Sequence, residues 1–403
     1  MARGWQSSDL TDREQQSFGI TTGSCFCAAA CASLYYKLSS LVAQSIEILT
    51  PQEKSILVDV NFNPKDGLDW FEVVKDSGDD PDITDKSLIR ACCFVNEALQ
   101  KDLHLKARPL SFEIDGHQVY IYASDGVGEV SLAGLKVEQG YPAINPGPQE
   151  MLIKSVQKIL RELELEVFLE LNFVVQIVDG ERLAEQTFNP KLGITGGLSI
   201  LGTTGFVRPL SEEAWIDSIF EELHVAQAFS NAVVLTFGGS SEKAAQHCLH
   251  IHSRHLVQMI NFVGRVFDEA VSKGTKHIIV SGQPAKLTKL AGAIMNTNSK
   301  ESDAKKEIIL AELARMHAPY ELIDNINQAN TIKSCVEILA KSGYDEIWSR
   351  LAERIKAVLV TRAQKYFKSS VDIAVVFIDS EQVILGASQN LEPMLEEFVL
   401  DEA

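Results

Sequence analysis

A stretch rich in glycine and threonine, residues 193–205, is the segment whose composition most suggests ligand chemistry. Glycine has no side chain, so a backbone rich in it can approach a ligand closely, and threonine hydroxyls add hydrogen-bond donors. The stretch has neither the Gly-Lys-Ser/Thr of a Walker A loop nor the GxGxxG spacing of a dinucleotide fingerprint. A glycine run of this length has little structural purpose without a ligand, so we expect cofactor contacts from Gly196, Gly197, Gly202, Thr203, Thr204 and Gly205.

An acidic segment, residues 75–84, follows a predicted strand and contains Asp79, Asp80 and Asp82. We call it the Asp-rich turn. Carboxylates gathered around a turn can bind a hard cation, accept hydrogen bonds from a ribose or act as a general base. We expect a catalytic role for these three residues, and the alternative is a solvated turn without chemistry.

Five further polar residues lie where a strand is predicted to end or a helix to begin, which is where α/β sheets bind ligands. Thr21 and Thr22 precede a predicted helix whose first turn can hold an anion, and a capping turn is the alternative. Asn145 lies between prolines that stiffen its loop. Lys286 and Lys289 follow a predicted strand and share a helix face, where they either meet carboxylates or are solvated.

Two clusters contain metal-binding residue types without a metal-binding spacing. Cys25, Cys27 and Cys31 lie in an Ala-rich helical stretch on which Cys25 faces away from the other two. The four histidines of residues 247–255 do not follow a familiar zinc pattern. We expect no protein-bound metal, and we expect free thiols in a reducing compartment.

The elements that position these residues follow two patterns. In the first half, we expect helices at residues 24–38, 86–99 and 149–163, and strands at residues 45–50, 55–62, 70–75, 112–114, 118–123 and 173–178. Asp115-Gly116 joins two of these strands as a hairpin turn. The first half is therefore expected to be an α+β domain with a mixed sheet.

The second half alternates short apolar runs with long helical patterns, which predicts an α/β domain with a largely parallel sheet. Strands are expected at residues 232–236, 277–280 and 373–378, and helices at residues 287–295, 303–316, 331–341 and 346–366. The domain boundary is placed before the glycine-rich stretch, which gives domains at residues 1–190 and 191–403.

Composition and charge exclude several classes of protein. A chain of 403 residues that is 45% hydrophobic is globular material for two or three domains. Its net charge of −18 disfavours nucleic acid and anionic membranes as partners. No apolar run reaches the roughly 18 to 20 residues of a membrane span. We expect a cytoplasmic protein, capable of forming homo-oligomers, whose partner is a small molecule.

Six blocks, in one order along nearly the whole chain, resemble the signature blocks of the cobalt-precorrin-5B C1-methyltransferase family. They are GITTGSC at 19–25, KDSGDDPDIT at 75–84, DGVGEV at 125–130, GYPAINPGP at 140–148, GITGGLSILGTTGFVRPLSEEAW at 193–215 and NFVG at 261–264. The long fifth block is highly specific, whereas the others are specific only in combination.

The resemblance implies a reaction and its partners. It implies methyl transfer from S-adenosylmethionine to C1 of cobalt-precorrin-5B, which gives cobalt-precorrin-6A in anaerobic cobalamin biosynthesis. Cobalt then arrives inside the corrinoid substrate. In this interpretation the glycine-rich stretch lies beside the cofactor, and substrate contacts come from Thr21, Thr22, Asn145, Arg208, Lys286 and Lys289.

The chain departs from the family pattern mainly in its second half. Gln283 replaces the histidine of a Gly-His-x-Gly-Lys block, and Asn298 replaces the histidine of Thr-His-Ser. Gly239 stands where the family has asparagine, and Gln149 where it has arginine. Glutamine and asparagine carry neither a proton nor a charge at neutral pH. A non-catalytic tetrapyrrole-binding or partner protein is therefore the alternative to an active methyltransferase.

Overall fold

The computed structural model describes residues 18–100, 103–106, 108–165, 167–208 and 212–398. The chain divides into two compact units, Met1–Ser211 and Glu212–Ala403. This division follows the glycine-rich stretch, whereas the sequence suggested a boundary before it, at residue 190. The difference arises because short strands within residues 194–207 pair with strands of the first unit.

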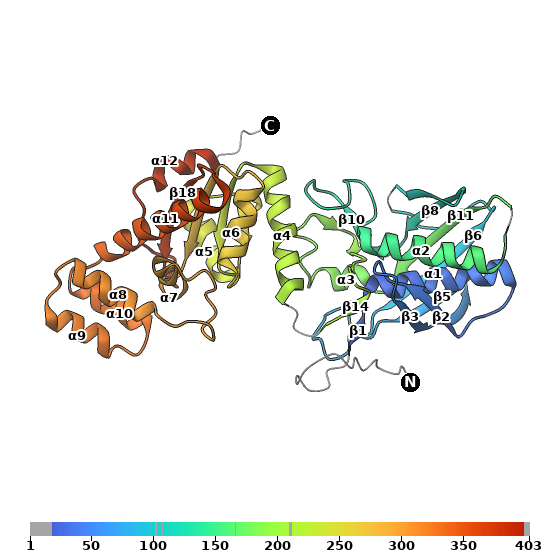
Figure 1. Cartoon of the computed structure of the whole chain (residues 1–403), viewed down its shortest axis with the longest axis horizontal. Helices are drawn as coiled ribbons and strands as arrows, with labels where there is room; N and C mark the ends of the chain where they lie inside the picture. The colour runs from blue at the N-terminus through green and yellow to red at the C-terminus, as the bar shows by residue number, and fades with distance from the viewer. Residues whose placement is uncertain (1–17, 101–102, 107, 166, 209–211, 399–403) are drawn as a thin grey trace. The chain divides into compact units, whose positions relative to one another are not determined.

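A six-stranded mixed sheet forms the framework of the first unit (Figure 1). In spatial order its strands are β4 (Asn61–Lys65), β5 (Leu68–Val74), β6 (Leu88–Val95), β11 (Glu170–Ile177), β8 (His117–Ala123) and β7 (Leu110–Ile114). β11 pairs parallel with β8, and the other pairs are antiparallel. A separate hairpin joins β2 (Ser45–Leu49) to β3 (Ser55–Asp59). The expected α+β unit with a mixed sheet is confirmed.

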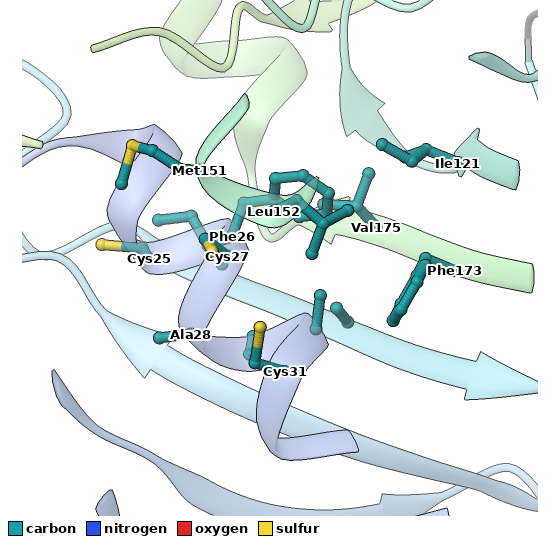
Figure 2. Close-up of a cluster of buried hydrophobic side chains, with 14 of the residues drawn as sticks. Cys25, Phe26, Cys27, Ala28, Cys31, Ile121, Met151, Leu152, Phe173 and Val175 are labelled. Carbon is teal, nitrogen blue, oxygen red and sulfur yellow. The ribbon is translucent and has the colours of Figure 1, made fainter. Parts of the chain in front are cut away.

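The core of the first unit lies between this sheet and the helices α1 (Thr22–Ser39) and α2 (Pro146–Glu162). Figure 2 shows Cys25, Cys27 and Cys31 of α1 among the side chains of this core. Because α1 carries alanines and cysteines here, its backbone can pack closely against the sheet, and residues 25–32 are fully buried. Burial raises the pKa of Cys25 to about 12, so this thiol stays protonated and unreactive.

Residues 86–99 contain a central strand, β6, instead of the expected helix. β6 lies between β5 and β11 and is covered on both faces. Ile89, Ala91 and Cys93 face the core with α1, whereas Cys92 and Phe94 pack on the opposite face. A strand buried on both faces is apolar at nearly every position, and periodicity alone does not distinguish it from a buried helix.

The second unit contains a five-stranded sheet that is parallel except at one edge. In spatial order its strands are β16 (Leu256–Gln258), β15 (Ala232–Thr236), β17 (His277–Gly282), β18 (Asp372–Ile378) and the antiparallel β19 (Ile384–Ala387). One face packs against α6 (Val263–Ser272) and α11 (Glu346–Phe367), and the other against α5 (Gly239–Leu249) and α12 (Leu391–Leu395). The predicted α/β unit with a largely parallel sheet is confirmed.

Most of the expected helices of the second unit form near their predicted bounds. They are α8 (Lys305–Arg315), α10 (Ile332–Lys341) and α11, and α4 (Glu212–Phe229) and α9 (Tyr320–Gln328) accompany them. The helix expected at residues 287–295 is wrong, because a short α7 (Pro284–Leu287) is followed by a 3-10 turn that ends where Ala293 adopts a φ of 59°. Within the described ranges, no helix is both long and apolar enough to cross a membrane.

Candidate functional site

Backbone pairing brings the glycine-containing blocks of the first unit together. β1 (Gly19–Ile20) pairs with β14 (Phe206–Val207) at the end of the glycine-rich stretch. β13 (Gly197–Leu198), inside that stretch, pairs with β9 (Gly126–Val127). On its other side β1 meets the Asp-rich turn, since Ile20 N–H donates to the Asp76 carbonyl at 2.7 Å. Segments far apart in the sequence therefore meet before the first turn of α1.

The first turn of α1 is filled by the protein's own backbone. Thr21 is its N-cap, and its Oγ1 accepts from Ser24 N–H at 3.1 Å. Gly23 N–H donates to the Leu201 carbonyl at 3.0 Å, and the Thr22 hydroxyl bonds to the backbone of the same residue. These groups would otherwise be free to bind an anion. Thr21 and Thr22 thus take part in a capped helix terminus, which was the alternative to an anion site. Their role as substrate contacts stays a prediction.

The glycines of the glycine-rich stretch are explained by close contact with other parts of the chain. A Cβ at Gly197 would lie 2.3 Å from the backbone of Gly126, and one at Gly202 would lie 2.3 Å from Thr21 Oγ1. Gly205 has a φ of 82°, and a Cβ there would lie 2.9 Å from Ile56. The expectation that only a ligand requires such a run is therefore wrong.

The rim of the glycine-rich stretch remains accessible. Thr203 and Thr204 are exposed, and Gly196 has only the Lys106 side chain within 4 Å of its hypothetical Cβ, with Nζ at 3.6 Å. Arg208 follows β14 and is exposed, and Asn145 is half-buried before α2 with its N–H bonded to the Ile200 carbonyl at 2.9 Å. These residues keep their predicted roles as proposals.

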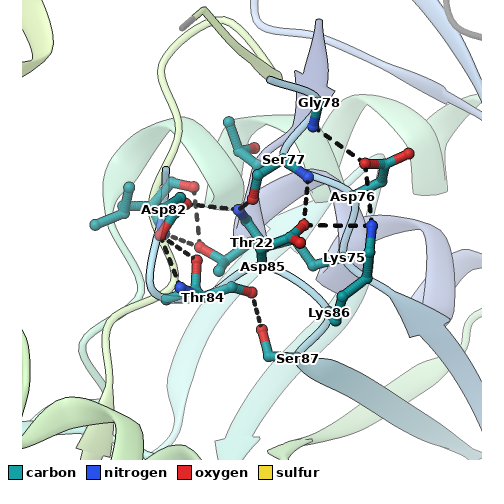
Figure 3. Close-up of polar contacts among 12 residues, drawn as sticks. Thr22, Lys75, Asp76, Ser77, Gly78, Asp82, Thr84, Asp85, Lys86 and Ser87 are labelled. Carbon is teal, nitrogen blue, oxygen red and sulfur yellow. Dashed lines mark hydrogen bonds and ion pairs between the residues drawn. The ribbon is translucent and has the colours of Figure 1, made fainter. Parts of the chain in front are cut away.

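The Asp-rich turn is held together by a buried lysine, as Figure 3 shows. Lys75 is 1% exposed, and its Nζ donates to Asp82 Oδ2 at 2.6 Å and to Ser77 Oγ at 2.5 Å. The other Asp82 oxygen accepts from the N–H and hydroxyl of Thr84, both at 2.8 Å. Burial pushes the pKa of Asp82 upward, but Lys75 and Thr84 outweigh it and hold the pKa below its ordinary value.

These contacts separate the three predicted catalytic aspartates. Asp82 stabilises the turn through its contacts with Lys75 and Thr84. Its lowered pKa also makes it a weak general base. Asp79 is exposed and Asp80 half-buried, beside the Gly78 backbone that bridges to Phe18. The geometry therefore favours Asp79 and Asp80 over Asp82 as groups that can reach a ligand.

The two predicted lysines of the second unit have different environments. Lys289 is 2% exposed, and its Nζ donates to the carbonyls of Thr297 and Ser302 at 3.1 and 2.6 Å, so it anchors a loop. Lys286 is half-buried, with Nζ 5.8 Å from the centre of the Phe237 ring. In the described ranges no carboxylate lies within ion-pair distance of Lys286. Burial, and then repulsion by Lys289, lowers the pKa of Lys286.

Sequence reasoning missed a group of residues at the carboxyl ends of β15, β16 and β17. These are Gly238, Gly239, Gln258 and Ser281, beside the predicted Lys286. The Ser281 hydroxyl is buried and has no hydrogen-bond partner within the described part of the chain. The sequence signal was indirect, because the Gly239 and Gln283 departures from the family pattern lie within three residues after the ends of β15 and β17.

Comparisons with known proteins cover both units. The sequence matches the family described as CbiD over residues 9–209 and the family described as CbiD, C-terminal domain, over residues 296–389. It is 32% identical to the cobalt-precorrin-5B C(1)-methyltransferase of Alkaliphilus metalliredigens, covering 98% of this chain and 99% of that protein. The protein of that name from Clostridioides difficile is also 32% identical, covering 96% and 98%.

Among solved structures, a cobalamin biosynthesis protein from Archaeoglobus fulgidus is 25% identical, with a TM-score of 0.37. The match covers 74% of this chain and 86% of that one.

Proposed function

Because the chain belongs to the CbiD family, we propose that it is a cobalt-precorrin-5B C1-methyltransferase of cobalamin biosynthesis. The observation that carries the proposal is the end-to-end match, at 32% identity over 98% of the chain, to a protein of that name. The match includes both units, so it supports the complete enzyme and not one shared domain.

The methyl donor we propose is S-adenosylmethionine. Its sulfonium gives up the methyl group as a new carbon–carbon bond forms at C1, and the sulfur keeps the electron pair and becomes a neutral thioether. Such a displacement needs accurate placement of the reacting atoms more than it needs a protein nucleophile. The described residues offer two alternative locations for this ligand, one at the exposed Thr203 and Thr204 of the first unit and one at the open glycines that follow β15 in the second.

The substrate is a macrocycle with several carboxylates, and it needs cationic partners although the chain carries a net charge of −18. Lys286 supplies one, because its ammonium has no carboxylate within ion-pair distance in the described ranges. Arg208 supplies a second, exposed after β14. Lys289 is engaged by backbone carbonyls and acts on the substrate only by holding the loop beside Lys286. Cobalt belongs to the substrate, which we expect the enzyme to meet in the cytoplasm.

A binding protein without catalysis is the second candidate. It is favoured by Gln283 and Asn298, which lack the proton-carrying imidazole of histidine. Asn298 accepts a backbone hydrogen bond from Lys300 at 3.1 Å and shapes its own turn.

The experiment that tests both candidates is a methyl-transfer assay with S-adenosylmethionine and cobalt-precorrin-5B, followed by mass spectrometry. Addition of one methyl group to the corrinoid, together with release of S-adenosylhomocysteine, is the expected result. Tight corrinoid binding with no transfer would instead establish the binding protein. If the protein neither binds the corrinoid nor transfers a methyl group, both candidate functions are contradicted.

A further inference from the structure

We propose that the nucleoside end of the methyl donor binds in the second unit, at the carboxyl ends of β15 and β17 and against the first turn of α5. The inference rests on the proposed function, which supplies the ligand class, and it adds the location and the residues. It moves the donor away from the glycine-rich stretch, where the sequence placed it.

The topology of the second unit selects this position. The parallel strands lie in the order β16-β15-β17-β18. The chain therefore runs in one direction from β15 to β16, and then in the opposite direction, past β15, from β16 to β17. The helices that follow β15 and β16 therefore begin on opposite faces of the sheet, with α5 on one and α6 on the other. Open α/β sheets bind their ligands at the carboxyl ends of the two strands between which the order reverses, which here are β15 and β17.

The first turn of α5 has no side-chain cap, whereas the first turn of α1 is capped by Thr21 and bonded to the Leu201 carbonyl. The N-cap of α5 is Gly238, which has no side chain to cap the helix, and the first backbone bond runs from Glu242 N–H to the Gly238 carbonyl at 2.9 Å. A Cβ at Gly238 would meet nothing within 4 Å, and one at Gly239 would meet only the end of Gln258, at 4.0 Å. The N–H groups of this turn are thus available to the ribose hydroxyls of a nucleoside.

Ser281 supplies an independent indication of a ligand. Ser281 is 1% exposed, and its hydroxyl has no hydrogen-bond partner among the residues that the structure describes. Ser281 shares a sheet face with Ile279, which packs with Ala244 and Ala245 of α5. It lies two residues nearer the carboxyl edge than Ile279, so it points toward the first turn of α5. A buried hydroxyl without a partner costs free energy, and a ligand atom bound there would remove that cost.

The end of β16 offers the groups that a ribose needs. Gln258 is the last residue of β16 and lies 20 positions after Gly238 (258 − 238), the spacing at which nucleoside-binding α/β folds carry their ribose-binding side chain. Its amide nitrogen donates to a Glu242 carboxylate oxygen, and its backbone N–H donates to Glu222 at 3.0 Å. These bonds fix the Gln258 side chain beside Gly239, where its amide oxygen can accept from a ribose hydroxyl.

Calorimetric titration of the full chain with S-adenosylhomocysteine tests the location. Ser281→Ala removes only the unpartnered hydroxyl, so we expect affinity to fall about tenfold while the melting temperature stays unchanged or rises. Gly239→Asp places a side chain in the open space at the first turn of α5, where its carboxylate stabilises the helix but occupies the room and the N–H groups that the ligand would use, so binding should be lost from a folded protein. Ser272→Ala, which removes an exposed hydroxyl at the carboxyl end of α6, is the matched control and should bind like the parent. Thr203→Val tests the alternative location in the glycine-rich stretch.

The outcomes separate this inference from the proposed function. If the parent binds and both second-unit variants bind equally well, the location is wrong and the function stands. If Thr203→Val alone loses affinity, the donor lies at the glycine-rich stretch. If the parent does not bind S-adenosylhomocysteine, the proposed donor fails, and this inference fails with it. Unchanged affinity with a raised melting temperature in Ser281→Ala would show that the orphan hydroxyl has no part in binding.

Discussion

Both units of the chain place glycines beside the first turn of a helix, and the surroundings of those glycines differ. In the first unit, Gly202 and Gly205 are packed against Thr21, Ser24 and Ile56, and the first turn of α1 beside them is capped by the chain itself. In the second unit, Gly238 and Gly239 have open space beside them, and their helix is uncapped. The denser glycine pattern thus serves backbone packing, and the sparser one leaves room for a ligand.

The comparison shows why glycine counts alone do not locate a site. Glycine is required wherever a backbone must come close to something, and that partner is either another backbone or a ligand. Only the neighbours of a hypothetical Cβ separate the two cases. Four experiments test this difference between the two units.

The largest effect is expected from adding one methyl group where two backbones touch. Gly197→Ala would place a Cβ 2.3 Å from Gly126, and neither backbone can yield without breaking the β9–β13 pair. We expect the free energy of unfolding to fall by more than about 4 kcal/mol, measured by denaturant titration. Gly239→Ala is the matched control, expected to leave stability unchanged or raise it by up to about 1 kcal/mol. Equal effects of the two changes would remove the contrast between the units.

The second experiment asks whether the Asp-rich turn is structural. Asp82→Asn leaves the buried Lys75 ammonium without its ion-pair partner, so stability should fall by about 3 kcal/mol at neutral pH. The lowered pKa of Asp82 means that its contribution is present above the ordinary aspartate pKa and is lost as pH falls through the folded-state value. Unfolding curves of parent and variant should therefore converge below about pH 4. A constant difference across that range would contradict the ion-pair account.

The elements that the sequence predicted well are those with one exposed face. The hairpin at Asp115-Gly116 forms as expected, with φ angles of 47° and 87°, because its turn chemistry is local. The identity of β6 could not be predicted, since burial on both faces removes the alternation that marks a strand. The candidate site was predicted only in part for a similar reason. The contacts that engage Thr21, Lys289 and Asp82 come from loops distant in sequence or depend on burial, neither of which composition reveals.

The third experiment compares lysines that look alike in the sequence. Lys286→Gln should weaken corrinoid binding by about 2 kcal/mol, the cost of one charge-assisted hydrogen bond, and leave the melting temperature unchanged. Because burial lowers the pKa of Lys286, the parent should lose corrinoid affinity with rising pH earlier than an ordinary lysine would predict. Lys289→Gln should instead lower stability, since Lys289 holds the loop carbonyls of Thr297 and Ser302. If only Lys289→Gln weakened corrinoid binding, Lys289 and not Lys286 would be the substrate contact.

The smallest expected effect concerns the positions where this chain lacks the family's histidines. Gln283 directly follows β17, at the edge of the sheet where we propose that the donor binds. Asn298 lies in the loop that Lys289 anchors. If imidazoles there assist by carrying a proton, Gln283→His with Asn298→His should raise turnover at least about tenfold, or about 1.4 kcal/mol in the barrier. Binding of both ligands should not change, because neither replacement adds a group to the first turn of α5. A fast parent that gains nothing would show that the reaction needs no imidazole at these two positions.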